Sequence, residues 1–546
     1  MGSIRAIVSR QGSISSADVR PSCIGYGPRG IMRKLRINLL TLAMAFALTS
    51  VSSALASTPV ATPPPPQLAP VTSEYQELFA EQLGRLPHYE LDLVLDADLS
   101  TLGGTLVLTY PNRTGQTLTE LPLRLYPNAE YYAEGETSIA SIEIDGQAVA
   151  PRFDESGTVL FVDLPAPLLP GETLNASIAF TTVVPRNSIG SYGILNHDVA
   201  GERFVLADWY PVVAGRDETG WRLEPPTSQG DPTFSATGLF DVLVRVPDGY
   251  AVIASGDESI LEDGSVRIAS GPVREFAMVA ATGLTSLSKD MGDTEVSVFV
   301  APGHAASGER MLDLATAALD YYNAAFGPYP FRELDFVEVP LALAYGVSWS
   351  GILFMNQSQL SLPAESLAAL DFTIMHELGH QWWGGTVGAN SNDHTWMVEG
   401  LTNATAVLAH SAIQGPAAAT SSLYTWIVGP YLNLLDSFGD GVADVSIFDQ
   451  PVDSPLSTLA YGKGALGFLA IRNAIGNDAF LQALADYANA FRLGIAEPSD
   501  LLAAFEAASG QNLDALWTYW FESAITTRAD VETLGPEIVA SLPEPA

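Results

Sequence analysis

Short stretches of alternating hydrophobic and polar residues fill the chain from about residue 88 to residue 287. Turn-forming Gly, Pro, Asn and Asp residues separate these stretches. Successive side chains of a β-strand point to opposite faces, so alternation with a period of two predicts strands buried on one face. Frequent turns between such strands favour antiparallel pairing. The clearest predicted strands lie at 89–99, 104–112, 120–128, 139–146, 158–164 and 174–184.

The period of the hydrophobic pattern changes near Gly308. Residues 309–327 carry hydrophobic side chains at helical spacing, and a Gly-Pro pair ends the stretch. A helix-rich second domain is therefore expected after the β-domain, which makes the predicted fold class α+β. We expect a proline-rich linker at 57–71, an antiparallel β-domain at 72–297, a mainly helical domain at 298–526 and a tail at 527–546.

Residues 1–56 are predicted to be a leader. Met32 is a plausible start, followed by basic residues within 33–36, an apolar run at 39–48 and small residues ending at Ala56. This order is typical of a secretory signal peptide that is cleaved after the small residues. An uncleaved membrane anchor is the alternative, but the run is short for a span and polar residues interrupt it. We expect a secreted, periplasmic or cell-surface protein with no stable membrane insertion after cleavage.

The charge and the cysteine count limit the possible chemistry. Lys and Arg number 25 against 62 Asp and Glu, which gives a net charge of −37. No basic stripe is long enough to follow a phosphate backbone, so we expect no nucleic-acid partner. The single cysteine, Cys23, lies in the predicted leader. Any metal must therefore be held by histidine and carboxylate.

The candidate chemistry begins in the segment 365–385, which is predicted to be one helix ending at Gly384 and Gly385. His376 and His380 are four residues apart, so both imidazoles leave the same helical face and can bind one Zn²⁺. Glu377 lies beside the open position of such a metal. The alternative is an ordinary helix with two histidines on an exposed face.

A third protein ligand is needed, and Glu399 supplies a carboxylate near the start of a second helical stretch, with 18 residues between it and His380. Two histidines and one carboxylate leave one tetrahedral position for water. That open position is typical of a catalytic zinc rather than a structural one. We expect one Zn²⁺ per chain. His394 and His410 are interpreted as solvated or core histidines, because three ligands already suffice.

The sequence HELGHQWWGG followed by WMVEGLT resembles the zinc signature of the gluzincin aminopeptidase family, which includes aminopeptidase N and leukotriene hydrolase. Two further stretches, FGPYPFRELDFVEVP at 326–340 and WYPVVAGRDETGW at 209–221, are similar to segments of the same family. The resemblance implies an aminopeptidase N-like β-domain packed on a thermolysin-like catalytic domain, with a peptide as substrate. The stretch 510–523 resembles the end of that catalytic domain, so we expect a short form without the helical C-terminal domain and a less enclosed site.

Roles follow from chemistry and from this resemblance. Glu377 is the expected general base, which accepts a proton from the zinc-bound water and passes it to the leaving amine. Tyr461 is the expected donor to the oxyanion, because it stands where the family has a tyrosine in a Y-x-K-G setting. An ordinary core tyrosine is the alternative. The glycines around Lys463 lack the other residues of a phosphate loop.

Two positions depart from the family pattern. Ser348 stands where the family has a glutamate that holds the free amino group of the substrate, and a serine cannot neutralise an ammonium. Val398 stands where the family usually has Asn or Asp beside the third ligand, so a polar contact is lost there. If the free amine is nevertheless recognised, an acid of the β-domain near Asp217 or Glu218 is the expected replacement.

The sequence therefore predicts a secreted zinc metallopeptidase, most similar to an aminopeptidase. Two alternatives remain open. One is a zinc hydrolase of the same fold that acts as an endopeptidase or on a non-peptide substrate, and the other is a binding protein without catalysis. The combined presence of His376, Glu377, His380, Glu399 and Tyr461 argues against the second alternative, because a scaffold needs none of these residues.

Overall fold

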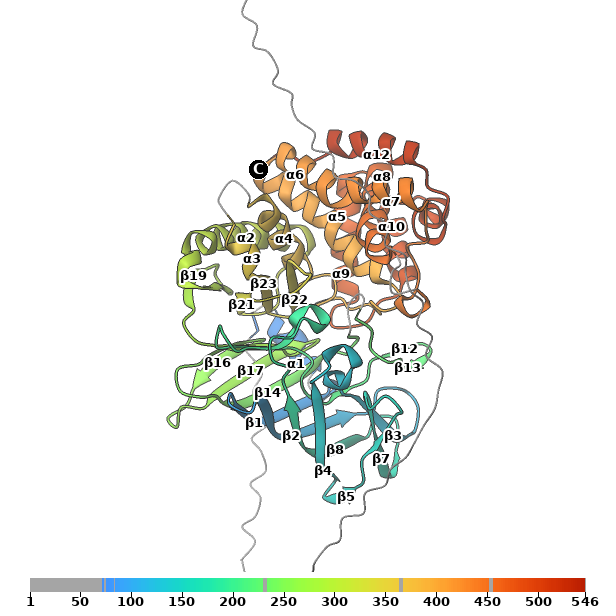
Figure 1. The fold of residues 1–546 in the computed structure, drawn as a ribbon. Coiled ribbons are helices and arrows are strands. Elements are labelled where there is room, and N and C mark those ends of the chain that lie inside the picture. The colour runs from blue at the N-terminus through green and yellow to red at the C-terminus, as the bar shows by residue number, and fades with distance from the viewer. Residues whose placement is uncertain are drawn as a thin grey trace, which may run out of the picture. The chain divides into compact units, whose positions relative to one another are not determined.

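The first part of the fold is an eight-stranded sheet (Figure 1). The computed structural model describes residues 71–72, 75–82, 84–228, 233–362, 367–450 and 455–545. The order of the sheet is β16-β17-β14-β1-β2-β8-β4-β5. These strands span Asp257–Ile260, Val266–Val273, Gly238–Arg245, His88–Asp96, Thr101–Pro111, Thr173–Val183, Glu136–Ile144 and Gln147–Val149.

Alternating burial along these strands confirms the pattern that predicted them. On β1, Leu91 and Leu93 are buried, whereas Asp92 and Val94 between and after them are exposed. The sheet is antiparallel except at one junction, where β1 and β14 pair in parallel. The paired residues His88 and Leu239 are 151 positions apart in the sequence, so no tight turn dictates the direction of the two strands.

Two four-stranded sheets and a hairpin complete the β-rich part. One sheet has the order β15-β18-β10-β9, with strands at Ala251–Ala254, Met278–Ala281, Arg203–Leu206 and Leu195–Asp198. The other has the order β11-β3-β7-β6, with strands at Val212–Val213, Leu118–Arg124, Val159–Leu168 and Arg152–Phe153. The hairpin pairs β12, Arg216–Asp217, with β13, Gly220–Trp221.

A five-stranded mixed sheet opens the second part of the fold. Its order is β19-β20-β21-β23-β22, with strands at Thr285–Asp290, Glu295–Val300, Glu333–Val339, Ile352–Asn356 and Gly346–Trp349. The predicted domain boundary between residues 297 and 298 falls within β20. The change of hydrophobic period at Gly308 marks the helix that follows, whereas the sheet itself already begins at Thr285.

Helices make up most of the remaining chain, so the α+β class is confirmed. The helices α1 to α6 span Gln76–Gln82, Ala305–Phe326, Gln357–Leu360, Ala368–Gly379, Thr395–Gln414 and Pro416–Ser422. The helices α7 to α12 span Gly429–Ser437, Gly464–Ile475, Asn477–Ala490, Pro498–Ser509, Asp514–Trp517 and Arg528–Ala540. The stretch predicted as a tail thus contains α12, whose Val531 and Ile538 are buried.

Helix α4 is shorter than the sequence predicted. It ends at Gly379, and His380 is its C-cap. The chain then turns, with the Gly384 N–H donating to the Val387 carbonyl at 2.8 Å and Gly384 at a φ of +111°. The glycines that were interpreted as the end of the helix therefore serve the turn that follows it. The second histidine sits at the helix end rather than within the helix.

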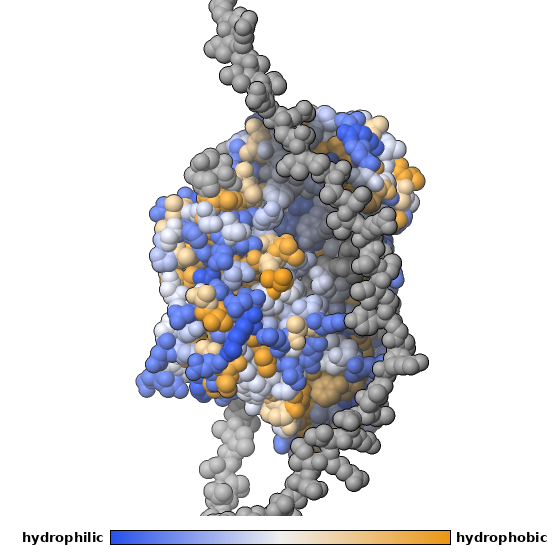
Figure 2. Space-filling model, viewed as in Figure 1, coloured by the Kyte–Doolittle hydropathy of each residue, from blue (hydrophilic) through white to orange (hydrophobic). Residues whose placement is uncertain are grey.

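The predicted leader and nearly all of the predicted linker lie outside the described residues, so cleavage and export stay predictions. Among the residues that the structure describes, no helix is both long and apolar enough to cross a membrane. Figure 2 shows hydrophobic side chains in small separate groups on the visible face.

One buried ion pair, between Lys463 and Asp440, links separate segments of the helical part. Lys463 is fully buried, and its Nζ donates to Asp440 Oδ2 at 2.8 Å and to the carbonyls of Gly441 and Ser523 at 2.7 and 2.6 Å. These contacts join η9, a π-helical turn at Thr458–Lys463, to the segment before α12. They also use all three donors of the ammonium group, which agrees with the dismissal of a phosphate loop here.

Replacing Lys463 by Met should lower the free energy of unfolding by about 3–5 kcal/mol, because Asp440 would stay buried without its counter-charge. Urea unfolding of both proteins measures the difference. As a control, Arg152→Met removes exposed ion pairs to Glu120 and Asp163 and should barely move the midpoint. An unchanged midpoint for Lys463→Met would show that Asp440 does not depend on this partner.

Candidate active site

Helices α4 and α5 bring the three predicted ligands to one point. His376 and His380 lie at the end of α4, and Glu399 lies in the second turn of α5. The two Nε2 atoms are 3.1 Å apart. Glu399 Oε2 lies 3.2 Å from His376 Nε2 and 3.3 Å from His380 Nε2. The three ligand atoms therefore form a nearly equilateral triangle.

This triangle fits a tetrahedral zinc ion. Zinc bonds of roughly 2.0–2.1 Å place neighbouring ligand atoms about 3.3 Å apart. The Glu399 Oε2 atom is buried, and beyond its contacts with the two imidazoles no hydrogen bond to it from a described residue is found. Two imidazoles and one carboxylate are a donor set that zinc prefers. The three residues would hold the ion and leave its fourth position open.

The charge of Glu399 and the two imidazoles of the site act on one another. Burial alone would lower the pKa of His380, but the Glu399 carboxylate outweighs it and raises the value to about 9. Burial alone would raise the pKa of Glu399, but the two imidazoles hold it well below its usual range. In the absence of a metal, this site therefore retains a proton that a metal ion must displace.

The turn after α4 orients His380. Its Nδ1 lies 3.0 Å from the Trp383 carbonyl and 3.3 Å from Thr402 Oγ1. A hydrogen bond to the carbonyl fixes the proton on Nδ1 and leaves the lone pair of Nε2 for a metal. Val398, the other predicted departure, is buried and lines the cavity. Thr402, one turn further along α5, thus supplies a polar contact close to the site.

Glu377 lies in a space that Gly346 keeps open. A Cβ atom at Gly346 would come within 2.5 Å of Glu377 Cγ, so the strand β22 can approach α4 only with glycine at this position. Burial raises the pKa of Glu377, and the two neighbouring imidazoles partly offset this effect. The sequence analysis missed Gly346, because the reason for a glycine here is a contact between distant segments.

Tyr461 faces the same cavity from η9. Its ring stacks beside that of His376, with centroids 6.0 Å apart and an interplanar angle of 25°. Asn403 Nδ2 donates to the Tyr461 carbonyl at 3.0 Å. Burial, together with the charge of Glu399, raises the pKa of Tyr461 well above its usual value. The hydroxyl therefore stays protonated and is able to donate a hydrogen bond.

The histidines that were not expected to be ligands both have other partners. His394 Nδ1 contacts Asp444 Oδ1 at 2.5 Å. His410 is buried, with Ser422 Oγ at 3.0 Å and Gln414 Oε1 at 2.9 Å from its two ring nitrogens. Neither belongs to the His376, His380 and Glu399 group.

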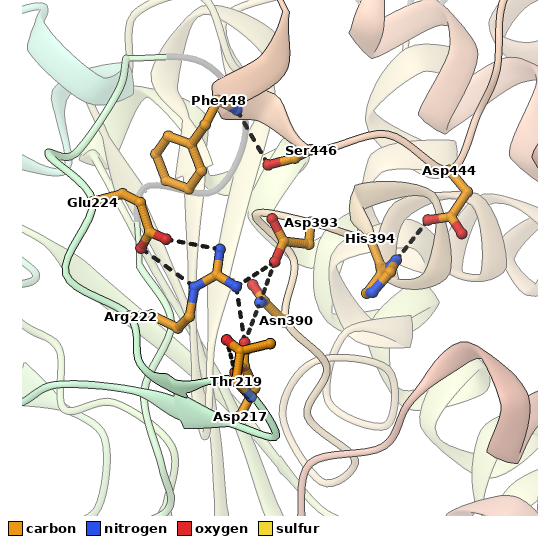
Figure 3. Close-up of polar contacts among 10 residues, drawn as sticks. All are labelled: Asp217, Thr219, Arg222, Glu224, Asn390, Asp393, His394, Asp444, Ser446 and Phe448. Carbon is orange, nitrogen blue, oxygen red and sulfur yellow. Dashed lines mark hydrogen bonds and ion pairs between the residues drawn. The ribbon is translucent and has the colours of Figure 1, made fainter.

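Two arginines of the β-rich part contact the segments next to the helices that carry the metal ligands. Arg222 contacts Asp217 and Glu224 of its own region at 3.0 and 3.1 Å, and reaches Asp393, just before α5, at 2.7 Å (Figure 3). Arg274 donates to the Gly384 carbonyl, in the turn after α4, at 2.8 Å. The β-rich part thus contacts the chain just after α4 and just before α5.

A cavity of about 700 Å³ surrounds the triangle. Ser348 lines it, and its Oγ accepts a hydrogen bond from Gln381 Nε2 at 2.8 Å. Two acids of the β-rich part, Asp208 and Glu275, also line the cavity. An acid near Asp217 or Glu218 was expected here instead, and neither of these residues lines the cavity. Asp217 is engaged with Arg222, whereas the positions of Asp208 and Glu275 depend on long-range packing that no local motif reveals.

The site's surroundings match a known family. Residues 310–520, which include α4 and α5, match the Peptidase family M1 domain. This part of the chain is a peptidase family M1 domain. Aminopeptidase M1-B of Oryza sativa subsp. japonica is 28% identical over 234 residues, which are 42% of this chain and 27% of that protein. Aminopeptidase M1 of Arabidopsis thaliana is 25% identical over 317 residues, which are 53% of this chain and 34% of that protein.

Solved structures share the fold around the M1 domain as well. An M1 zinc metallopeptidase mutant from Deinococcus radiodurans has a TM-score of 0.57 and 20% identity, covering 81% of this chain and 95% of its own. Native yeast LTA4 hydrolase has a TM-score of 0.62 and 15% identity, covering 81% of this chain and 68% of its own. The predicted gluzincin aminopeptidase family is confirmed, although the chain spans only about a third or less of the two plant relatives.

We expect the M1 domain to bind one zinc per chain, and Glu399→Ala to weaken zinc binding more than the roughly 10–100-fold typical of losing an outer-shell partner. Metal analysis after dialysis, with competition by a chromophoric chelator, measures both. The control His88→Gln, on β1, should bind zinc like the unaltered chain. A chain that stays free of zinc after refolding with the metal would contradict the assignment.

Proposed function

We propose that the chain is a zinc metallopeptidase of the aminopeptidase type, with peptides as substrates. One observation carries the proposal: a His-His-Glu triangle, a second glutamate and a tyrosine face one cavity of about 700 Å³. That volume suits a short peptide segment rather than a folded protein. In support, the Deinococcus radiodurans metallopeptidase has also been solved with a Tyr-Ser-Ala substrate.

Zinc, when bound, polarises the scissile carbonyl and acidifies a water molecule. Glu377 then accepts the proton of that water on its carboxylate and passes it to the leaving amine. Burial strengthens this role, because a carboxylate with a raised pKa is a better proton acceptor than an exposed one. Gly346 leaves room for this carboxylate, because a Cβ there would overlap the Glu377 side chain.

Tyr461 stabilises the negative charge that develops on the carbonyl oxygen. Its hydroxyl donates a hydrogen bond without bringing a charge of its own, since its pKa lies well above neutrality. The stacked His376 ring and the hydrogen bond from Asn403 to its carbonyl hold this residue in place. A donor fixed in advance costs no reorganisation when the charge appears.

The amino end of the substrate must be held without the family's usual glutamate. Ser348 carries no charge and already accepts a hydrogen bond from Gln381. Glu275 and Asp208 line the same cavity from the β-rich part. We assign them the role of binding the free ammonium group, with Glu275 as the main anchor. Glu275 follows Arg274 in the sequence, and Arg274 is held in place by its hydrogen bond to the Gly384 carbonyl in the turn after α4.

A second candidate is peptide hydrolysis without a need for a free amino end, as in an endopeptidase. The observation that favours it is the serine at position 348, since an enzyme without an amine anchor gains nothing from a terminal ammonium. Hydrolysis by Glu377 and the metal is common to both candidates. They differ only in their preference for free over blocked peptides.

Glu377→Gln should keep zinc binding but lose nearly all turnover, because an amide does not accept the proton. Tyr461→Phe, the milder companion, should lower kcat by about 10²–10³-fold with little change in KM. Steady-state kinetics on a tripeptide, together with metal analysis, test both. If zinc-loaded Glu377→Gln remained active, the proton-transfer role would be refuted.

Glu275→Gln should lower the preference for a free-amine tripeptide over its acetylated form by about 10–100-fold, because a charged hydrogen bond of roughly 1.5–3 kcal/mol is lost. The ratio of the two kcat/KM values measures this. Ser348→Ala is the matched control and should leave the ratio unchanged. An unaltered chain that cleaves both peptides equally well would favour the second candidate.

A further inference from the structure

The β-rich part and the M1 domain meet where two sheets pack face to face. Val205, Ile253 and Val279 of the β15-β18-β10-β9 sheet form a hydrophobic cluster with residues of the five-stranded sheet, among them Val337 and Val339 of β21. Side chains on a strand alternate between its faces. Asp335 and Glu333 therefore continue the face of β21 that carries these valines.

Acidic side chains gather at the end of this hydrophobic interface. Glu258 of β16 joins Glu333 and Asp335 of β21, and one oxygen atom of each lies within 4.8 Å of the others. Glu295 stands next to Glu333 on the neighbouring strand β20. Two of the three carboxylates thus come from one strand of the M1 domain, and the third comes from the edge of the eight-stranded sheet (Figure 1).

Asp335 has nothing in the described structure to satisfy its charge. The residue is only 4% exposed, and no hydrogen bond from a described residue to its carboxylate is found. Its own N–H donates to the Gly351 carbonyl at 2.9 Å, so the backbone is satisfied while the side chain is not. Glu258 uses Oε1 to accept a hydrogen bond from the Ala254 N–H at 2.6 Å, which leaves Oε2 available. The positive charge of Arg332 acts to lower the pKa of Asp257 and of Glu333, but the Arg332 side chain is itself exposed.

Three carboxylates that cluster around a buried side chain repel one another, and they cannot all stay charged without a counter-charge. Protons or a cation can supply it. A shared proton would satisfy one pair of oxygen atoms only. A cation between the three groups would satisfy all of them at once and would also contact the buried Asp335, which a solvent-exposed arginine does not reach.

We propose that Glu258, Glu333 and Asp335 bind one calcium ion at the junction of the β-rich part and the M1 domain. Calcium takes oxygen ligands at about 2.3–2.6 Å, so two oxygens bound to one ion lie at most about 5.2 Å apart. Three oxygens within 4.8 Å of one another can therefore share a single calcium ion. Magnesium is smaller and demands nearly ideal octahedral geometry. Zinc prefers nitrogen and sulfur, which this cluster lacks.

The bound ion ties β16, at the edge of the eight-stranded sheet, to β21 of the five-stranded sheet. Its role is structural, and the proposal does not depend on the peptidase function or on the His-His-Glu triangle. Without the ion, the interface keeps its hydrophobic cluster but carries uncompensated acids at one end. Calcium should therefore stabilise the folded chain rather than supply chemistry.

The test uses the full chain with its zinc site filled by one equivalent of zinc, so that added calcium meets only the acidic cluster. Isothermal titration should detect one calcium per chain. Thermal unfolding should shift upward by about 2–4 °C at a calcium concentration a hundred times Kd. Magnesium at the same concentration should give a smaller shift.

Asp335→Asn should abolish both calcium binding and the thermal shift, and Glu333→Gln serves the same purpose if that variant does not fold. Glu262→Gln, an exposed acid four residues after Glu258, is the matched control and should behave like the unaltered chain. The proposal is overturned if the unaltered chain neither binds calcium nor gains thermal stability from it. It is equally overturned if Asp335→Asn and Glu333→Gln both respond to calcium as the unaltered chain does.

Discussion

The arrangement of the site depends on one close approach, that of the carboxylate of Glu399 to two imidazoles at the end of α4. This approach requires α5 to lie against both α4 and η9. Gly400 permits it, since a Cβ there would come within 2.9 Å of the Ala460 carbonyl. The same contact that admits Glu399 to the triangle therefore also fixes the backbone beside Tyr461. A bulkier residue at position 400 would move Glu399 and Tyr461 together.

The β-rich part contributes to the site as well as covering it. Arg222 and Arg274 reach across to the segments before α5 and after α4, so the positions of the ligands depend on contacts outside the M1 domain. The acids at positions 208 and 275 enter the cavity from the same side. The metal ligands and the acids that line the cavity thus come from different parts of the chain.

Sequence patterns predicted the parts of the molecule that local spacing determines. The four-residue spacing of His376 and His380 places both on one helical face, and strand alternation marked the buried face of β1. Spacing did not predict the end of α4, because the following glycines serve a turn that also accepts a long-range hydrogen bond from Arg274. Nor did it reveal that Gly346 lies against Glu377 or that Glu275 lines the cavity, because these segments are distant in sequence and meet only in the fold.

The central claim is that three side chains from two helices form a single preorganised metal site. Anomalous X-ray scattering at the zinc absorption edge, on crystals of the zinc-loaded chain, tests it most directly. One strong peak is expected, about 2.0–2.2 Å from His376 Nε2, His380 Nε2 and a Glu399 oxygen atom. A peak bound by other residues, or one that Glu399 does not contact, would contradict it.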